Sequence, residues 1–287
     1  NSCWMPDSHR LNYKYINAET RIPQPVIRTD AGAPHRPSTW EPALASVTEA
    51  VKRVAPHQLA IIASGRMTNE ELYMVRHLAA QIGTDMVDIV PRMGESDGML
   101  IAADRNPNTN GARLVLGIEP GSRLAAIRDG VRNGSIKGIL TLGEDLTAPE
   151  AGFTAEDLKK LDYLFMTAHS VNETARHADL VLPGVTYAEK FGTMINVTGR
   201  IQRLNRAIQP VGYARDDWQI FRDITLLLGG NPALKDFNSA LDVLTVMSTE
   251  YDALNGVTWG SIGDGGQPIL ETGVTIPVVE HEKSQGR

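Results

Sequence analysis

The chain has 287 residues, of which 42% are hydrophobic and 22% charged, a balance that is ordinary for a globular protein with a sizeable core. The formal net charge of −6 and the scattered basic residues argue against a nucleic-acid-binding face or a basic membrane-surface patch. The single cysteine, Cys3, excludes a disulfide framework and any iron–sulfur cluster held by several cysteines of this chain. No apolar run approaches the ~20 residues that span a bilayer, so no direct membrane insertion is expected.

Residues 1–37 are polar, contain five prolines and hold too little apolar surface to fold alone. We predict that they form an extended arm, with the rings of Trp4, Tyr13 and Tyr15 buried against the following domain or against a neighbour. Because the first residue is Asn1 and not methionine, we expect the chain to be a fragment or a processed product of something longer.

From Ser38 the chain alternates buried apolar runs with amphipathic segments, the pattern of βαβ units in a mostly parallel sheet. We therefore predict a doubly wound α/β domain over residues 38–230, with helices on both faces of the sheet. A C-terminal helix and an irregular tail are expected over residues 231–287. The predicted strands lie near 59–63, 86–90, 138–142, 163–167 and 179–182, and the predicted helices cover 38–54, 68–83, 122–134, 154–161, 171–178, 216–229 and 240–254.

Ligands bind outside the carboxyl ends of the strands in doubly wound sheets. At that edge the sequence places four turns, most of them small or polar: Ser64-Gly65-Arg66, Gly143-Glu144-Asp145, Ala168-His169-Ser170 and Pro183-Gly184. A ligand edge fits this pattern, although every α/β protein has turns there. Residues 91–110, rich in Gly, Asn, Asp and Pro, are expected to form a long loop that is functional or disordered.

Familiar catalytic patterns are missing from the chain. It has no GxGxxG after the first strand of the sheet and no phosphate-binding P-loop. His169 and His177 lack a carboxylate at metal-ligand spacing, and Ser170 lacks the GxSxG context of a hydrolase nucleophile. We therefore predict no catalytic residue and no metal ligand, and interpret these histidines as surface or satisfied core residues.

The segment from Ala178 to Ile208 begins as a strand and then combines glycines with many polar side chains. We expect it to be an ordered loop without regular structure. Two interpretations are open: its polar groups satisfy its own backbone, or they line a pocket.

This segment also carries a family resemblance. "ADLVLPGVTYAEKFGTMINVTGRIQ" resembles the pattern A-D-x-V-L-P followed by E-x-x-G-T-x-x-N-x-x-G-R-x-Q of the molybdopterin oxidoreductase superfamily. "STWEPAL" and "DDWQIFRDI" are similar to helix segments of the same superfamily. "DRNPNTNGAR" and "CWMPDSHRLNYKYINAETRI" resemble segments of the large iron–sulfur subunit of NADH:quinone oxidoreductase, the 75-kDa type. In the last segment Pro6 stands where that family has a cysteine, and His9 where it has a glycine.

The resemblance implies an inherited pterin pocket, in which glycines let the backbone approach a phosphate and polar side chains donate to it. If the pocket is vestigial, Asn196 and Arg200 instead bond to the loop's own backbone or to carboxylates such as Glu189. The implied cofactor-binding residues are Glu189, Gly192, Thr193, Asn196, Gly199 and Arg200.

Two functions follow from the resemblance. The first is a scaffold portion of the peripheral arm of an NADH:quinone oxidoreductase (complex I), bound to other subunits on the cytoplasmic side of a membrane-attached complex. Such a portion has no redox centre of its own, is not catalytic alone, and leaves iron–sulfur clusters to a longer parent chain or to partners. The second is a shortened molybdopterin oxidoreductase of formate-dehydrogenase type, which binds a pterin cofactor with a partner. A free-standing α/β protein that binds a small anion is a third alternative.

Overall fold

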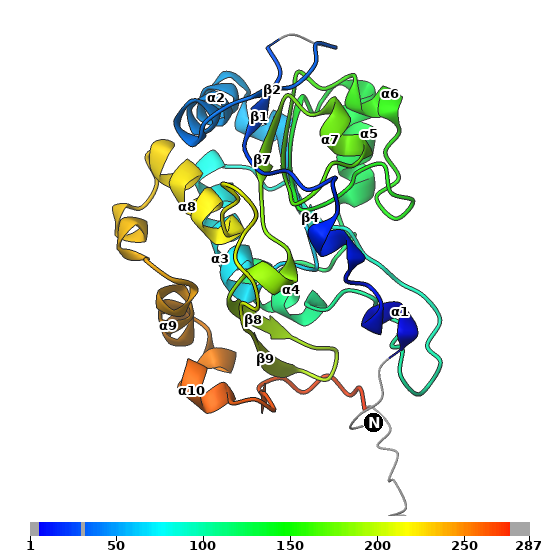
Figure 1. The fold of residues 1–287 in the computed structure, drawn as a ribbon, viewed down its shortest axis with the longest axis vertical. Coiled ribbons are helices and arrows are strands. Elements are labelled where there is room, and N and C mark those ends of the chain that lie inside the picture. The colour runs from blue at the N-terminus through cyan, green and yellow to red at the C-terminus, as the bar shows by residue number, and fades with distance from the viewer. Residues whose placement is uncertain (1–5, 30–31, 276–287) are drawn as a thin grey trace, which may run out of the picture.

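A seven-stranded sheet with helices on both faces forms the centre of the molecule (Figure 1). The computed structural model describes residues 6–29 and 32–275. The strand order is β2-β1-β7-β6-β5-β3-β4, in which β3 to β7 run parallel and β1 is antiparallel to both of its neighbours. The predicted fold class, a doubly wound and mostly parallel sheet, is confirmed.

The five parallel strands of this sheet follow the predicted apolar runs closely, whereas the two antiparallel strands lie in the arm and were not predicted. The seven strands are β1 (Val26–Ile27), β2 (Arg36–Pro37), β3 (Leu59–Ala63), β4 (Val87–Ile89), β5 (Gly138–Leu142), β6 (Tyr163–Ala168) and β7 (Leu180–Pro183). A second, antiparallel sheet has the order β10-β9-β8. Its strands are β8 (Gly192–Ile195), β9 (Arg200–Leu204) and β10 (Gln267–Pro268).

Most of the helices lie between successive strands of the main sheet, and the last three follow its last strand in the chain. The helices are α1 (Asp7–Arg10), α2 (Trp40–Arg53), α3 (Asn69–Ile82), α4 (Thr109–Leu116), α5 (Leu124–Asn133), α6 (Ala155–Leu158), α7 (Glu173–His177), α8 (Asp217–Leu227), α9 (Ala240–Glu250) and α10 (Trp259–Ile262). Short 3₁₀ segments are η1 (Lys14–Asn17), η2 (Pro56–Gln58), η3 (Tyr187–Glu189), η4 (Pro232–Asp236) and η5 (Asp252–Leu254). In the described part of the chain, none of the helices is long and apolar enough to cross a bilayer.

Two hydrophobic cores cover the two faces of the sheet. Side chains of α2, α3, α8 and α9 pack on one face, and those of α5, α6 and α7 pack on the other. The helix α3 shows why the sequence specifies these elements: Thr68 and Glu71 form a capping box at its start, and Gly83 ends it with φ of +79°. Val243, Leu244 and Met247 of α9 lie in the same core as α3 and α8, so the predicted division at residue 230 does not separate two cores.

The segment after β7 differs from the expected loop because it contains the hairpin β8–β9. Asn196 closes the turn: its Oδ1 accepts from the Thr198 amide (3.1 Å) and the Arg200 amide (3.0 Å). Gly199 has φ of +77°, and a Cβ there would lie 2.1 Å from the Leu270 carbonyl oxygen. The polar residues of the turn kept these two short strands from being recognised in the sequence, although Ile195 and Ile201 lie in the core. Helix α4 is likewise an addition to the expected elements.

The arm is tied to the sheet by main-chain pairing and by one buried ion pair. Strand β1 pairs with the outer edge of β7, and the Arg21 guanidinium contacts both Glu189 carboxylate oxygens at 2.9 and 2.7 Å. The Tyr15 ring is half-buried against His169, whereas Tyr13 is exposed, so the predicted burial holds for one of these two rings. Trp4 lies outside the described residues.

We expect Arg21→Ala to lower the free energy of unfolding by about 3–5 kcal/mol, because the Glu189 carboxylate would stay buried without its cation. The two side chains are only 4% and 0% exposed. The matched control is Arg53→Ala, which removes an exposed pair with Glu49 and should change stability by less than about 0.5 kcal/mol. Urea denaturation measures both. Equal effects of the two variants would show that Arg21 does not anchor the arm.

Candidate functional site

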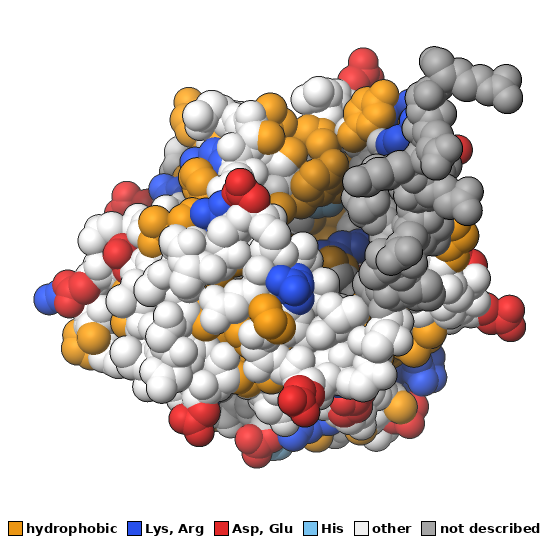
Figure 2. Space-filling view, turned by 90° about the horizontal axis from the view of Figure 1, so that it is seen from below, with side chains coloured by type: hydrophobic (Ala, Val, Ile, Leu, Met, Phe, Trp, Pro, Cys, Tyr) orange, Lys and Arg blue, Asp and Glu red, His pale blue; other side chains and the backbone are white. Residues whose placement is uncertain are grey.

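A cavity of about 340 Å³ lies at the carboxyl edge of the main sheet. The chain passes from β3 outward to β4 and then crosses to β5 on the other side of β3, so the strand order reverses between β3 and β5. Open α/β sheets bind ligands at such a reversal. The cavity is lined there by Arg66 after β3, Arg92 after β4 and Asp145 after β5. Figure 2 shows a hollow on the face seen from below, with hydrophobic side chains along one rim and basic side chains inside.

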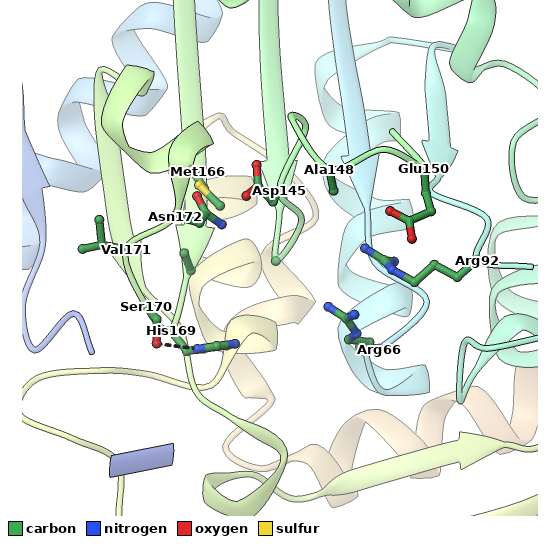
Figure 3. Close-up of a pocket in the computed structure, with 12 residues that line it drawn as sticks. Arg66, Arg92, Asp145, Ala148, Glu150, Met166, His169, Ser170, Val171 and Asn172 are labelled. Atoms are coloured by element: carbon green, nitrogen blue, oxygen red, sulfur yellow. Dashed lines mark hydrogen bonds between the residues drawn. The ribbon is translucent and has the colours of Figure 1, made fainter. Parts of the chain in front are cut away.

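Arg66 is the exposed member of a loop whose other residues are buried. Ser64 Oγ accepts from the Arg66 amide (3.1 Å), which fixes the backbone at the turn. Among the described residues, the Arg66 guanidinium has no hydrogen-bond or ion-pair partner. Figure 3 shows it turned into the cavity. It is therefore a cation whose hydrogen-bonding groups are available to a ligand.

Arg92 approaches the cavity from the neighbouring strand end (Figure 3). Its Nη1 donates to Glu144 Oε1 (2.8 Å) and its Nη2 to Glu144 Oε2 (2.5 Å). Glu144 is 0% exposed, so this pair holds the arginine rigidly at the cavity wall. A bidentate pair leaves further N–H groups of the guanidinium for a second anion.

His169 forms the opposite wall. Its ring points across the cavity toward Arg66 (Figure 3), its Nδ1 lies 2.9 Å from Ser170 Oγ, and Tyr15 packs on it with ring centroids 5.2 Å apart. Burial, together with the positive charges of Arg21, Lys190 and Arg66, lowers the pKa of His169 to about 4. The imidazole is therefore neutral at physiological pH and contributes a hydrogen-bonding group without charge.

The two acidic residues that line the cavity, Asp145 and Glu150, differ in how firmly hydrogen bonds fix their side chains. Asp145 Oδ1 accepts from Thr174 Oγ1 (2.7 Å), Thr147 Oγ1 (2.7 Å) and the Thr147 amide (3.0 Å). Burial opposes its ionisation, but these hydrogen bonds lower the pKa of Asp145 below its ordinary value. The Asp145 carboxylate is thus engaged in hydrogen bonds that stabilise the loop after β5. Glu150, in contrast, lies at the exposed side of the cavity near Arg92.

Behind the cavity a buried polar junction joins α3 to the hairpin. The Thr193 amide donates to Glu70 Oε2 (2.8 Å), and Thr193 Oγ1 donates to Glu70 Oε1 (2.8 Å). Asn69 Nδ2 donates to Thr193 Oγ1 (3.0 Å), and the Ile195 amide donates to Asn108 Oδ1 (2.7 Å). Burial raises the pKa of Glu70 to about 7, and none of the described residues places a cation against it.

A second buried group beside this junction does contain cations. Lys190 Nζ lies 2.8 and 2.9 Å from the Glu71 carboxylate oxygens, and Arg206 Nη2 lies 2.7 Å from Asp216 Oδ2. Asp217 is buried beside them, and burial together with the charge of Glu71 raises its pKa. The positions of these charges explain why the chain between β7 and β8 lies against the start of α3.

The six residues predicted to bind a cofactor are mostly engaged within the chain. Glu189 accepts from Arg21 and Thr186, and Arg200 donates to the carbonyls of Gly265 (3.2 Å) and Gly266 (2.6 Å), outside its own loop. Thr193 and Asn196 make the contacts described above. A Cβ at Gly192 would meet Thr68 at 2.6 Å, and Gly199 lies in the turn. None of the six lines the described cavity.

Sequence reasoning placed Arg66, Asp145 and His169 in turns at the ligand edge without assigning them a role. Arg92 lies in the long loop, where nothing in the local pattern marks it. Arg92 could have been identified from the strand reversal between β3 and β5, because the ends of β3 and β4 lie side by side at that edge of the sheet.

Comparisons with known proteins agree with this architecture. Residues 93–225 match the family model of molybdopterin oxidoreductase. A putative formate dehydrogenase of Staphylococcus haemolyticus is 33% identical over 138 residues, which cover 47% of this chain and 14% of that protein. The alpha subunit of an F420-dependent formate dehydrogenase of Methanococcus maripaludis is 35% identical over 149 residues, 47% of this chain and 22% of that subunit.

A third relative is the alpha subunit of an NADPH-Fe(3+) oxidoreductase of Geobacter sulfurreducens, 33% identical over 144 residues, 50% of this chain and 17% of that subunit. The structure of acetylene hydratase from Pelobacter acetylenicus is similar in fold, with a TM-score of 0.54 and 9% identity over 85% of this chain and 66% of that one. Residues 93–225 are therefore similar to a molybdopterin oxidoreductase family domain. The matched segments span less than a quarter of the length of these curated relatives.

We expect the free energy of unfolding to fall as the pH rises from about 4.5 to about 7, because folded Glu70 keeps a proton that the unfolded chain has released. Glu70→Gln removes this ionisation and keeps an acceptor for the Thr193 amide. The variant should be more stable than the wild type at pH 8, by up to about 3 kcal/mol, and should show no gain at pH 4. Urea denaturation across this pH range measures the difference.

The neighbouring residue provides the control for this experiment. Glu71→Gln leaves the Lys190 ammonium buried without its partner, so it should lose about 3–5 kcal/mol at pH 8. A Glu70→Gln variant as unstable as Glu71→Gln at that pH would contradict the assignment of a proton to Glu70.

Proposed function

We propose that this chain is the cofactor-binding portion of a molybdopterin-type oxidoreductase subunit, and that its cavity takes the phosphate-bearing part of a pterin cofactor. The observation that carries the proposal is the guanidinium of Arg66, which has no partner among the described residues and lies in a cavity at the strand reversal of the sheet. The match of residues 93–225 to the molybdopterin oxidoreductase family supports the same conclusion.

The residues present fit an anionic, partly planar group. Arg66 and the free N–H groups of Arg92 offer donors for phosphate oxygens, and the neutral His169 offers a hydrogen bond beside the Tyr15 ring. A cavity of about 340 Å³ lies at the lower end of the usual range for ligand sites, so it holds part of a large cofactor. When bound, such a cofactor supplies the redox centre of the oxidoreductase. For the six cofactor-binding residues predicted from the sequence, we propose contacts to a more distant part of the same cofactor.

The assembly is proposed by analogy with the relatives. Two of them are named as alpha subunits, and two as formate dehydrogenases. We therefore propose partner subunits that complete the site and a reaction of formate-dehydrogenase type. An attachment of that assembly to the cytoplasmic side of a membrane complex stays a prediction.

A second candidate function is the scaffold portion of an NADH:quinone oxidoreductase. The observation that favours it is that polar groups of the segment after β7 form their hydrogen bonds within this chain. Glu189, Thr193 and Asn196 are examples. Such a segment stabilises the fold whether or not a cofactor is bound.

We expect the purified chain to bind inorganic pyrophosphate and Arg66→Ala to weaken that binding by 10- to 100-fold, since a charge-assisted hydrogen bond contributes about 1.5–3 kcal/mol. Isothermal titration calorimetry at fixed ionic strength measures the affinity. Arg53→Ala removes a cation from the exposed surface of α2 and should leave the affinity unchanged. Equal binding by the wild type and Arg66→Ala, or no binding by the wild type, overturns the proposal.

Pterin content separates the two candidate functions. The chain is expressed in a host that makes the cofactor, and the purified protein is oxidised to release any fluorescent pterin. Pterin from the wild type that is lost in Arg66→Glu supports the cofactor-binding function. An absence of pterin from the wild type supports the scaffold, whereas equal amounts in both proteins would show that the chain holds a pterin without Arg66 and would overturn the assigned cavity.

A further inference from the structure

We infer that Asn106 and Asn108 are positioning residues that hold Arg66 and Arg92 at a fixed separation, and that this separation makes the cavity prefer a diphosphate to a single phosphate. The inference rests on the proposed function, because it assumes that the two arginines bind an anion. It concerns residues that do not line the cavity themselves.

Asn108 fixes the loop that carries Arg66. Its amide donates to the Gly65 carbonyl (3.0 Å), and its Nδ2 donates to the Met67 carbonyl (2.7 Å), so both neighbours of Arg66 are held by one residue. The Asn108 side chain is 0% exposed, and it also bonds to Asn69 (3.0 Å) and to the Ile195 amide (2.7 Å). The loop is thereby fastened to α3 and to the hairpin at once.

Asn106 fixes the strand end that carries Arg92. Its Nδ2 donates to the Val90 carbonyl (3.0 Å), and its Oδ1 accepts from Arg92 Nη1 (3.4 Å). The same side chain packs on the Arg66 loop: a Cβ on Gly65 would lie 2.5 Å from Asn106 Cγ. Asn106 thus touches both arginine-bearing segments.

Pro107 joins the two asparagines and restricts the backbone between them. The short segment from Asn106 to Asn108 therefore sets the spacing between the loops after β3 and β4. Figure 3 shows the two guanidinium groups turned into the cavity from these loops. A ligand that reaches both arginines gains a second contact that is effectively intramolecular, and this gain depends on the spacing. A single phosphate that contacts one arginine does not depend on it.

A purely structural role for the asparagines predicts a different result. Loss of their hydrogen bonds would then lower stability and leave the relative affinities of folded protein for two anions unchanged. A positioning role changes the ratio of the pyrophosphate affinity to the phosphate affinity. The ratio is therefore the measurement that separates the two roles.

The test titrates the chain with inorganic pyrophosphate and with inorganic phosphate by calorimetry, under conditions where urea denaturation shows each variant to be folded. We expect Asn106→Ala to weaken pyrophosphate binding at least 10-fold and phosphate binding less than threefold. Gly65→Ala tests the same junction without removing an asparagine, because its Cβ displaces the Asn106 side chain, and we expect a loss of the same kind. Ser239→Ala is the matched control, since it removes capping hydrogen bonds on α9 and should leave both affinities unchanged.

The outcomes also distinguish this inference from the function on which it rests. If Arg66→Ala binds pyrophosphate as well as the wild type, the proposed function fails, and the inference with it. If Arg66→Ala weakens binding while Asn106→Ala and Gly65→Ala both keep the wild-type ratio, only the positioning role is wrong. If either Asn106→Ala or Gly65→Ala does not fold, the comparison is made with the other of these two variants.

Discussion

The ion pair between Lys190 and Glu71 is the contact on which the arrangement behind the cavity depends. Both side chains are almost fully buried, at 7% and 1% exposed, and an unpaired charge in that position costs several kcal/mol. The chain that follows β7 must therefore lie across the start of α3. Once it does, Thr193 reaches Glu70, and the hairpin β8–β9 reaches the segment from Asn106 to Asn108. One electrostatic requirement thus brings together three parts of the sequence that are far apart.

This arrangement has a direct effect on the cavity. The loop after β3 is short, and an isolated turn would let Arg66 take many positions. Hydrogen bonds to Gly65 and Met67 from the far side of the loop remove that freedom. The side chain of Arg66 remains exposed while its backbone is fixed, which lowers the entropy that a ligand must remove on binding.

The sheet could be predicted from the sequence because each central strand is a continuous apolar run, such as Leu59–Ala63, and each helix is amphipathic. Hairpin β8–β9 could not, since its turn residues and its buried Thr193 appear polar when their partners on α3 are unknown. The residues of the candidate site likewise fall into those that the sequence pattern located and those that it did not. Arg66 and His169 lie at predicted strand ends, whereas Arg92, Asn106 and Asn108 act through contacts between segments that no local pattern reveals.

The edges of the main sheet have a consequence for how this protein meets other chains. At one edge lies β2, two residues long and ending in Pro37, which has no amide hydrogen. At the other edge the outward backbone groups of β4 are already bonded: the Val87 carbonyl accepts from Arg123 (3.3 Å), the Ile89 amide donates to Asp88 (2.7 Å), and the Ile89 carbonyl accepts from Gly121 (3.0 Å). Strand addition at either edge is thereby discouraged, as is edge-to-edge aggregation. At the main sheet a partner chain would then be recognised through side chains and loops and not through backbone pairing.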